Sequence, residues 1–174
     1  MLEFVNSGYH QSAIVSPEIR KETDILRWYN KPKNVNEADQ YRFSKVFLMY
    51  AVNKLAEEVS PTDVIITSVC PGFVATGLAR DHNFPGISIV WFLIRMSFAF
   101  SPEVGANTIL SGTTQGAQAH GRFWKFDKIM PIAPSISGND NKQLASRIWN
   151  EITDALRKDV PMTTQTLLSV PSWR

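Results

Sequence analysis

The sequence predicts an α/β fold, a partial Rossmann-like doubly wound sheet of three parallel strands with crossover helices. Short apolar runs at 2–7 and 63–69 are bounded by turn residues, as buried strands are, and a third strand is expected to begin at Gly121-Arg122-Phe123-Trp124. Longer segments at 37–59 and 141–158 place their apolar residues at helical spacing. Buried strands that alternate with helices are typical of a parallel sheet with right-handed crossovers.

The first expected strand, 2–7, ends in a hydroxyl and a glycine, Ser7 and Gly8. The interval from Ser16 to Ala38 then carries five Lys or Arg, four Asp or Glu and two prolines, which predicts an inserted loop or a short helix. The helix from about Glu37 to Val59 follows, with its apolar positions at Val46, Phe47, Tyr50, Ala51 and Leu55.

The second expected strand, 63–69, runs directly into Cys70-Pro71-Gly72, where a turn is expected. A short helix is predicted from Phe73 to Leu78. The apolar segment from Ile87 to Phe100 is 14 residues long and contains Arg95, so it falls short of the roughly 20 residues that span a bilayer. It predicts a buried or amphipathic helix over a cleft, and peripheral membrane contact stays open as the lesser alternative.

Ser101-Pro102-Glu103 has the signals of a helix start: a capping serine, a proline in the first turn and an acid beside it. That helix is expected to run to about Ser111. The terminal helix, 141–158, is amphipathic, with apolar positions at Ile148, Trp149, Ile152 and Leu156.

Composition indicates one domain over residues 1–174, with 44% apolar residues to fill a core. A net charge of +2, with both signs interspersed, gives no indication of nucleic-acid binding. The single cysteine, Cys70, excludes an internal disulfide and fits a small apolar filler, and no Cys/His spacing predicts a metal site. The N-terminus lacks the pattern of a secretory signal, so a cytoplasmic location is expected.

Tyr41-Arg42-Phe43-Ser44-Lys45 places a phenol and an ammonium four residues apart on one helix face. A tyrosine ordinarily ionises near pH ~10, and a cation beside it favours the phenolate, so the pair can transfer protons. Tyr and Lys at this spacing also occur by chance on solvated helices. The neighbouring strand–Ser and strand–Pro-Gly-x-x-x-Thr signals favour the functional interpretation.

This order of signals resembles the C-terminal half of the short-chain dehydrogenase/reductase family, over nearly the whole chain. The resemblance implies that Tyr41 is the general acid/base, that Lys45 supports it and holds the nicotinamide ribose, and that Ser7 binds the substrate oxygen. It further implies that Pro71, Gly72 and Thr76 border the nicotinamide of NADP or NAD. Pro71 and Gly72 have a purely local interpretation as well, because a strand commonly ends in a Pro-Gly turn.

The sequence departs from the family in two respects. The nine glycines form no Gly-rich dinucleotide fingerprint, so the N-terminal nucleotide-binding half has no counterpart, and the chain alone is not expected to bind a dinucleotide tightly. The gap of 34 positions from Ser7 to Tyr41 is long and resembles the retinol-dehydrogenase-like branch common among fungi. Ser7 is the preferred catalytic serine, because Ser12 and Ser16 lie in the expected loop.

The sequence therefore predicts a truncated NAD(P)-dependent oxidoreductase for a hydrophobic alcohol or ketone, such as a lipid, retinoid-like or polyketide-derived molecule. Phe84, Trp91, Phe92, Phe98 and Phe100 favour such a substrate, although core packing explains them equally well. Two alternatives remain: a non-redox isomerase, dehydratase or cyclase that uses Ser7, Tyr41 and Lys45, and a non-catalytic partner of a full-length relative. Strand 2–7 is expected to have an open outer edge, through which a homodimer or that relative could pair.

Overall fold

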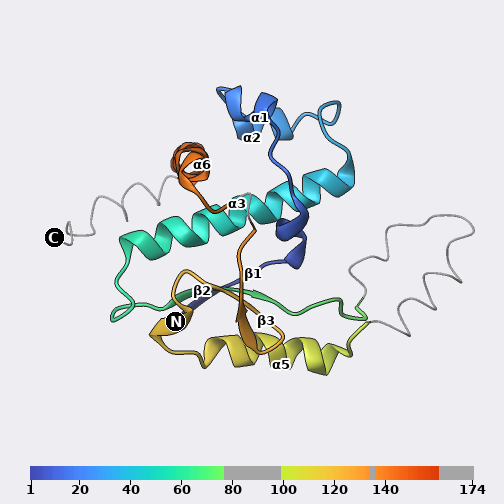
Figure 1. The fold of residues 1–174 in the computed structure, drawn as a ribbon, viewed down its shortest axis with the longest axis vertical. Coiled ribbons are helices and arrows are strands. Elements are labelled where there is room, and N and C mark those ends of the chain that lie inside the picture. The colour runs from blue at the N-terminus through green and yellow to red at the C-terminus, as the bar shows by residue number, and fades with distance from the viewer. Residues whose placement is uncertain (77–98, 134–135, 161–174) are drawn as a thin grey trace, which may run out of the picture. The chain divides into compact units, whose positions relative to one another are not determined.

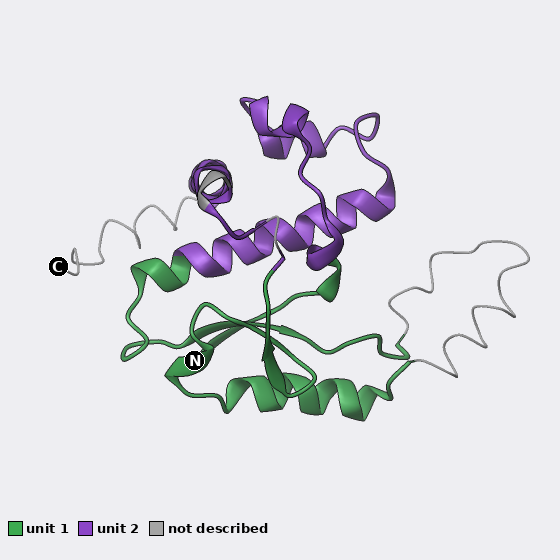
Figure 2. Ribbon diagram, in the orientation of Figure 1, with its two compact units in different colours: residues 1–9, 55–132 green, residues 10–54, 133–174 purple. Residues whose placement is uncertain are grey.

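The computed structural model describes residues 1–76, 99–133 and 136–160 (Figure 1). The chain divides into two compact units, coloured separately in Figure 2. The first unit comprises residues 1–9 and 55–132, and the second comprises residues 10–54 and 133–174. The prediction of a single domain over residues 1–174 stays a prediction.

The first unit is built on a four-stranded sheet of order β1-β2-β3-β4. Strands β1 (Leu2–Val5), β2 (Ile66–Cys70) and β3 (Phe123–Lys125) are parallel and neighbour one another in chain order, which confirms the predicted α/β class. Helix α5 (Pro102–Thr113) contacts these three strands (Figure 1). A one-turn 3-10 helix, Ala117–Ala119, lies between α5 and β3.

Strand β2 lies between β1 and β3, and all five of its residues are buried. Its start is fixed by His120, whose Nδ1 accepts the Ile66 N–H at 3.2 Å while Nε2 lies 2.9 Å from the Ala56 carbonyl oxygen. Nothing in the sequence around His120 predicts this role. It satisfies polar groups at the edge of the core, and such groups are costly to leave unpaired.

Helix α5 begins as the sequence predicts. The Ser101 hydroxyl oxygen accepts the Val104 N–H at 3.3 Å, and Pro102 occupies the first turn. The helix ends at Thr113, about one half turn beyond the expected end.

The strand boundaries differ from those expected. Strand β1 ends at Val5 rather than at residue 7, and β2 begins at Ile66 and includes Cys70. The reason for the later start is a turn, in which the Asp63 and Val64 N–H groups both donate to the Ser60 carbonyl, at 3.0 and 3.1 Å.

The short helix predicted from Phe73 is wrong for the described residues 73–76. Val74 instead forms an isolated parallel bridge with Phe100, and the Phe100 N–H donates to the Phe73 carbonyl at 2.7 Å. The helix predicted over Ile87 to Phe100 falls outside the described residues, except for Ala99 and Phe100. Within the described ranges, no helix combines the length and apolar character needed to cross a membrane.

Strand β4 (Lys128–Met130) was not predicted. It pairs antiparallel with β3 through a two-residue turn, in which Phe126 and Asp127 have φ of 52° and 54°. Such turns favour Asn and Gly, so the Phe-Asp pair gave no hairpin signal.

The second unit contains α1 (Pro17–Lys21), α2 (Ile25–Tyr29), most of α3 (Glu37–Glu58) and α6 (Asn139–Asp159). A 3-10 helix, Gly8–Ser12, precedes them. The inserted interval is thus two short helices, and α3 and α6 lie where the sequence predicts them.

Helix α6 holds the inserted segment through side-chain contacts to its backbone. The two Glu151 carboxylate oxygens accept the N–H groups of Ile25 and Leu26, at 3.1 and 2.8 Å. The Arg147 guanidinium donates to the carbonyl oxygens of Arg20, at 2.6 Å, and Glu22. These charged groups satisfy backbone groups that two five-residue helices cannot satisfy internally.

Glu3 is an acid in a half-buried position on β1. Among the described residues, neither of its carboxylate oxygens has a hydrogen-bond partner, and a side chain at Gly112 of α5 would strike one of them. Burial raises the pKa of the Glu3 carboxyl above its ordinary value of 4.5. Ionisation of Glu3 therefore opposes folding.

We expect the substitution Glu3→Gln to increase the free energy of unfolding at about pH 7.5 more than at about pH 4. Because the folded-state pKa is raised, wild-type stability falls as pH rises from the unfolded pKa through the folded pKa, and the glutamine variant lacks this loss. Urea unfolding of both proteins at the two pH values measures this change in the free energy of unfolding. A glutamine variant less stable than wild type at pH 7.5 would show instead that the carboxylate is paired.

Candidate active site

Ser7 lies just beyond the carboxyl end of β1. The Asn6 N–H still donates to the Val69 carbonyl of β2, at 2.6 Å, and the Asn6 side-chain oxygen accepts the Ser7 N–H at 2.8 Å. The Ser7 hydroxyl oxygen accepts the Tyr9 N–H at 3.3 Å. These contacts fix the Ser7 hydroxyl in a half-buried position at the end of the sheet.

Pro71 and Gly72 follow β2 at the same end of the sheet. Gly72 has a φ of 85°, and a Cβ at this position would lie 2.9 Å from the Phe100 ring. Both the backbone conformation and the close approach of Phe100 therefore require glycine. Because β1 and β2 are parallel, their carboxyl ends bring Ser7 and this turn to one edge.

Cys70 connects the two segments. Its buried Sγ accepts the Gly8 N–H at 3.3 Å and the Gly72 N–H at 3.4 Å. The interpretation of Cys70 as a small apolar filler accounts for its burial but not for these two contacts. The sequence could not show them, because Gly8 and Cys70 are 62 positions apart.

Thr76 is exposed and belongs to the same unit as Ser7. Its N–H donates to the Val74 carbonyl at 2.8 Å, and the neighbouring Ala75 N–H donates to the Phe100 carbonyl at 2.9 Å. These backbone contacts hold the segment from Gly72 to Thr76 against Phe100.

Tyr41 and Lys45 lie side by side on α3. The Lys45 Nζ is 5.5 Å from the centroid of the Tyr41 ring, a distance at which an ammonium is attracted to the ring face. Tyr41 is 43% exposed. Ser44, between them in the motif, donates to the Tyr41 carbonyl at 2.7 Å and so belongs to the helix surface.

Two other tyrosines of the second unit, Tyr29 and Tyr50, are buried. Burial raises the pKa of Tyr50 to about 12, and it raises the pKa of Tyr29 still further. Neither phenol is suited to proton transfer near neutral pH. Tyr41 differs from both in its exposure and in having an ammonium beside its ring.

The structure thus brings the predicted residues together in two groups. Ser7, Pro71, Gly72 and Thr76 belong to the first unit, and Tyr41 and Lys45 belong to the second.

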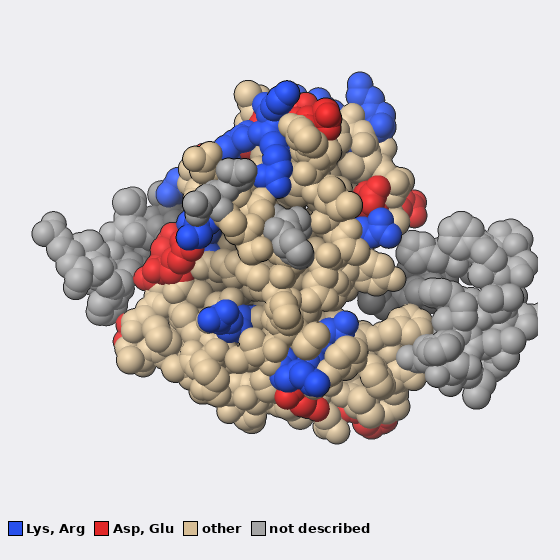
Figure 3. All heavy atoms as spheres, viewed as in Figure 1, with Lys and Arg blue, Asp and Glu red and all other residues tan. Residues whose placement is uncertain are grey.

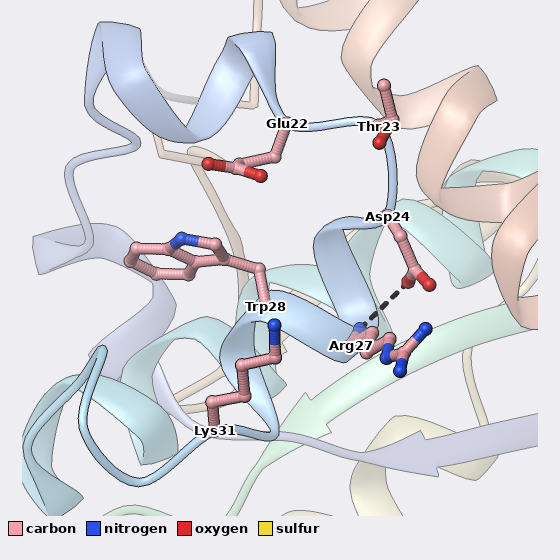
Figure 4. A pocket seen from close by; sticks show the side chains of 6 residues that line it. All are labelled: Glu22, Thr23, Asp24, Arg27, Trp28 and Lys31. Carbon is pink, nitrogen blue, oxygen red and sulfur yellow. Dashed lines mark hydrogen bonds between the residues drawn. The ribbon is translucent and has the colours of Figure 1, made fainter.

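The second unit also has a shallow pocket of about 200 Å³ in the inserted segment (Figure 4). Two acids, two bases, a threonine and an indole surround it, and the Arg27 N–H donates to the Asp24 carboxylate at 3.0 Å. None of its lining residues is a predicted site residue. They are Glu22, Thr23, Asp24, Arg27, Trp28 and Lys31.

Charged residues are scattered over the face that Figure 3 shows, with basic and acidic side chains set among uncharged ones.

Comparison with curated proteins finds relatives along most of the chain. "Short-chain dehydrogenase/reductase phmF" of Phaeosphaeria nodorum is 31% identical over 159 residues, which cover 90% of this chain and 46% of the relative. "Short-chain dehydrogenase/reductase ffsI" of Aspergillus flavipes is 29% identical over 160 residues, covering 92% and 46%. A "Short chain dehydrogenase" of Arthrobotrys oligospora is 27% identical over 164 residues, covering 90% and 48%.

The chain spans about half the length of the curated relatives it matches. No protein-family model matches it, and no solved structure does.

We expect Cys70→Ser to retain more stability than Cys70→Val, although valine is the better apolar filler. A serine oxygen can still accept the Gly8 and Gly72 N–H groups, whereas valine leaves both without this acceptor, at a cost of about 1 kcal/mol or more. Guanidinium unfolding of the two variants makes the comparison. A valine variant as stable as wild type would show that Sγ contributes only volume.

Proposed function

Because the chain belongs to the short-chain dehydrogenase/reductase family, we propose that it carries the substrate and nicotinamide end of an NAD(P)-dependent oxidoreductase site. The proposed substrate is a hydrophobic alcohol or ketone. The observation that carries the proposal is the exposed Tyr41 with the Lys45 ammonium 5.5 Å from its ring centroid. The printed names of the relatives, short-chain dehydrogenases and reductases, support the reaction class.

In the proposed reduction, Tyr41 donates its phenolic proton to the carbonyl oxygen of the substrate. Ser7 donates a hydrogen bond to the same oxygen, which stabilises the negative charge that develops there. The positively charged Lys45 ammonium, 5.5 Å from the ring centroid, lies beside the negative charge that this transfer leaves on Tyr41. In the oxidation direction Tyr41 takes up the hydroxyl proton of the alcohol instead.

NAD(P), when bound, supplies the hydride in reduction and accepts it in oxidation. The Lys45 ammonium is a suitable hydrogen-bond donor for its nicotinamide ribose, and Pro71, Gly72 and Thr76 are proposed to border the nicotinamide ring. For the pyrophosphate of the cofactor, the sequence contains no Gly-rich fingerprint whose backbone could approach it. We therefore propose that the chain by itself holds only the nicotinamide end, and holds it weakly.

We expect Tyr41→Phe to lower the rate of hydride transfer from millimolar NADPH to 2-decanone by about 100-fold or more, because the substrate oxygen loses its proton donor. The rate is followed by loss of NADPH absorbance with the purified chain. Tyr29→Phe is the matched control, since it removes a buried phenol that has no hydrogen-bond partner among the described residues. Equal losses in both variants, or no wild-type rate above buffer, would contradict the proposed chemistry for this chain.

A second candidate function, association with another copy of the chain, is favoured by the position of β1. This strand lies at an end of the sheet order, and its residues Leu2 and Val5 are 44% and 52% exposed. An exposed apolar edge strand presents free backbone groups for pairing with another chain. We propose a homodimer through this edge, with a full-length relative as the alternative partner.

If β1 mediates the dimer, Val5→Lys gives a monomer in size-exclusion chromatography with light scattering, while wild type elutes as a dimer. A lysine on an edge strand opposes strand pairing. Leu110→Lys, on the exposed face of α5 at 61% exposure, is the control and should remain dimeric. A monomeric wild type, or dissociation by Leu110→Lys alone, counts against this edge.

A further inference from the structure

The turn between β3 and β4 is made of residues that do not favour it. Phe126 and Asp127 have φ of 52° and 54°, in the left-handed region where a bulky side chain is strained. The strand register also places Lys125 directly opposite Lys128, and like charges at facing positions destabilise a hairpin. The stability of the hairpin therefore does not explain why the sequence Lys-Phe-Asp-Lys stands at this turn.

The Phe126 side chain is not part of the buried core, because it is 47% exposed. Its ring packs edge-to-face with Phe100, with the two centroids 6.0 Å apart and an interplanar angle of 71°. The Lys125 Nζ lies 4.6 Å from the Phe126 ring centroid, a cation–π contact that restricts the orientation of the ring.

The two rings continue the surface that begins at the Pro71-Gly72 turn. A Cβ on Gly72 would lie 2.9 Å from the Phe100 ring and 3.7 Å from the Phe126 ring. Phe100 is 38% exposed, so both rings combine contact with the turn and access to solvent. We call Phe100 and Phe126 the aromatic pair. It lies against the turn that the proposed function places beside the nicotinamide.

We propose that Phe126 is a substrate-contacting residue whose ring, with Phe100, binds the apolar portion of the alcohol or ketone and sets a preference for long substrates. This inference rests on the proposed function. Residues in sparsely populated backbone conformations cluster at functional sites, and here Asn or Gly would relieve the strain but remove the ring. The contact is apolar, so its contribution grows with the length of the substrate chain.

The test is ketone binding without cofactor, measured by saturation-transfer NMR with 2-decanone and 2-butanone. We expect Phe126→Asn to weaken 2-decanone binding by about fivefold or more and 2-butanone binding by less than about twofold, because only the longer ketone covers the ring. The thermal midpoint should not fall, since asparagine suits the left-handed conformation. Phe126→Gly serves as a second variant and should behave alike.

Two controls separate the ring from its surroundings. Asp127→Asn alters the same turn but keeps the ring and an acceptor for Ser111, whose hydroxyl lies 2.5 Å from the Asp127 carboxylate. Leu110→Ala removes an exposed apolar side chain from the same unit, on α5. Both should bind 2-decanone as wild type does.

Unchanged 2-decanone binding in both Phe126 variants would overturn the proposal. Equal weakening by Leu110→Ala, or no binding of 2-decanone to the wild type, would overturn it as well. If the wild type binds 2-decanone but transfers no hydride to it, the proposed oxidoreductase function fails while the role of Phe126 in ketone binding stands. The two failures are therefore distinguishable.

Discussion

The parallel pairing of β1 with β2 is the constraint on which the first unit depends. It brings the two carboxyl ends to one edge, so that Ser7 and the Pro71-Gly72 turn meet although they are more than 60 positions apart. Cys70 then joins the two segments through a single sulfur that accepts a backbone N–H from each. A thiol is a weak acceptor, and its value here lies in satisfying two amide groups that are close to a buried strand end.

The second unit depends on a different kind of contact. Helices of five residues are too short to be stable alone, and α1 and α2 are held by side chains of α6. Glu151 and Arg147 bind backbone N–H and carbonyl groups more than 120 positions away in the sequence. The inserted segment is therefore part of a packed unit, and it leads into α3, which carries Tyr41 and Lys45.

Local signals predicted most of the elements. Ser101 and Pro102 marked the start of α5, helical spacing marked α3 and α6, and the Tyr41–Lys45 pair followed from helix geometry alone. The misses have two physical causes. The role of Cys70 and the contacts of Glu151 join distant segments, and the β3–β4 hairpin has a Phe-Asp turn that contradicts turn preferences.

We propose that this chain holds the nicotinamide end of the cofactor without its adenosine end. The most direct measurement is to compare the dissociation constants of reduced nicotinamide mononucleotide and NADPH by fluorescence titration of the purified chain. We expect values that agree within about threefold, because the adenosine half finds no Gly-rich turn to bind it. NADPH affinity tighter by about tenfold or more would show that the chain also binds the adenosine half, which would then contribute about 1.4 kcal/mol of binding free energy.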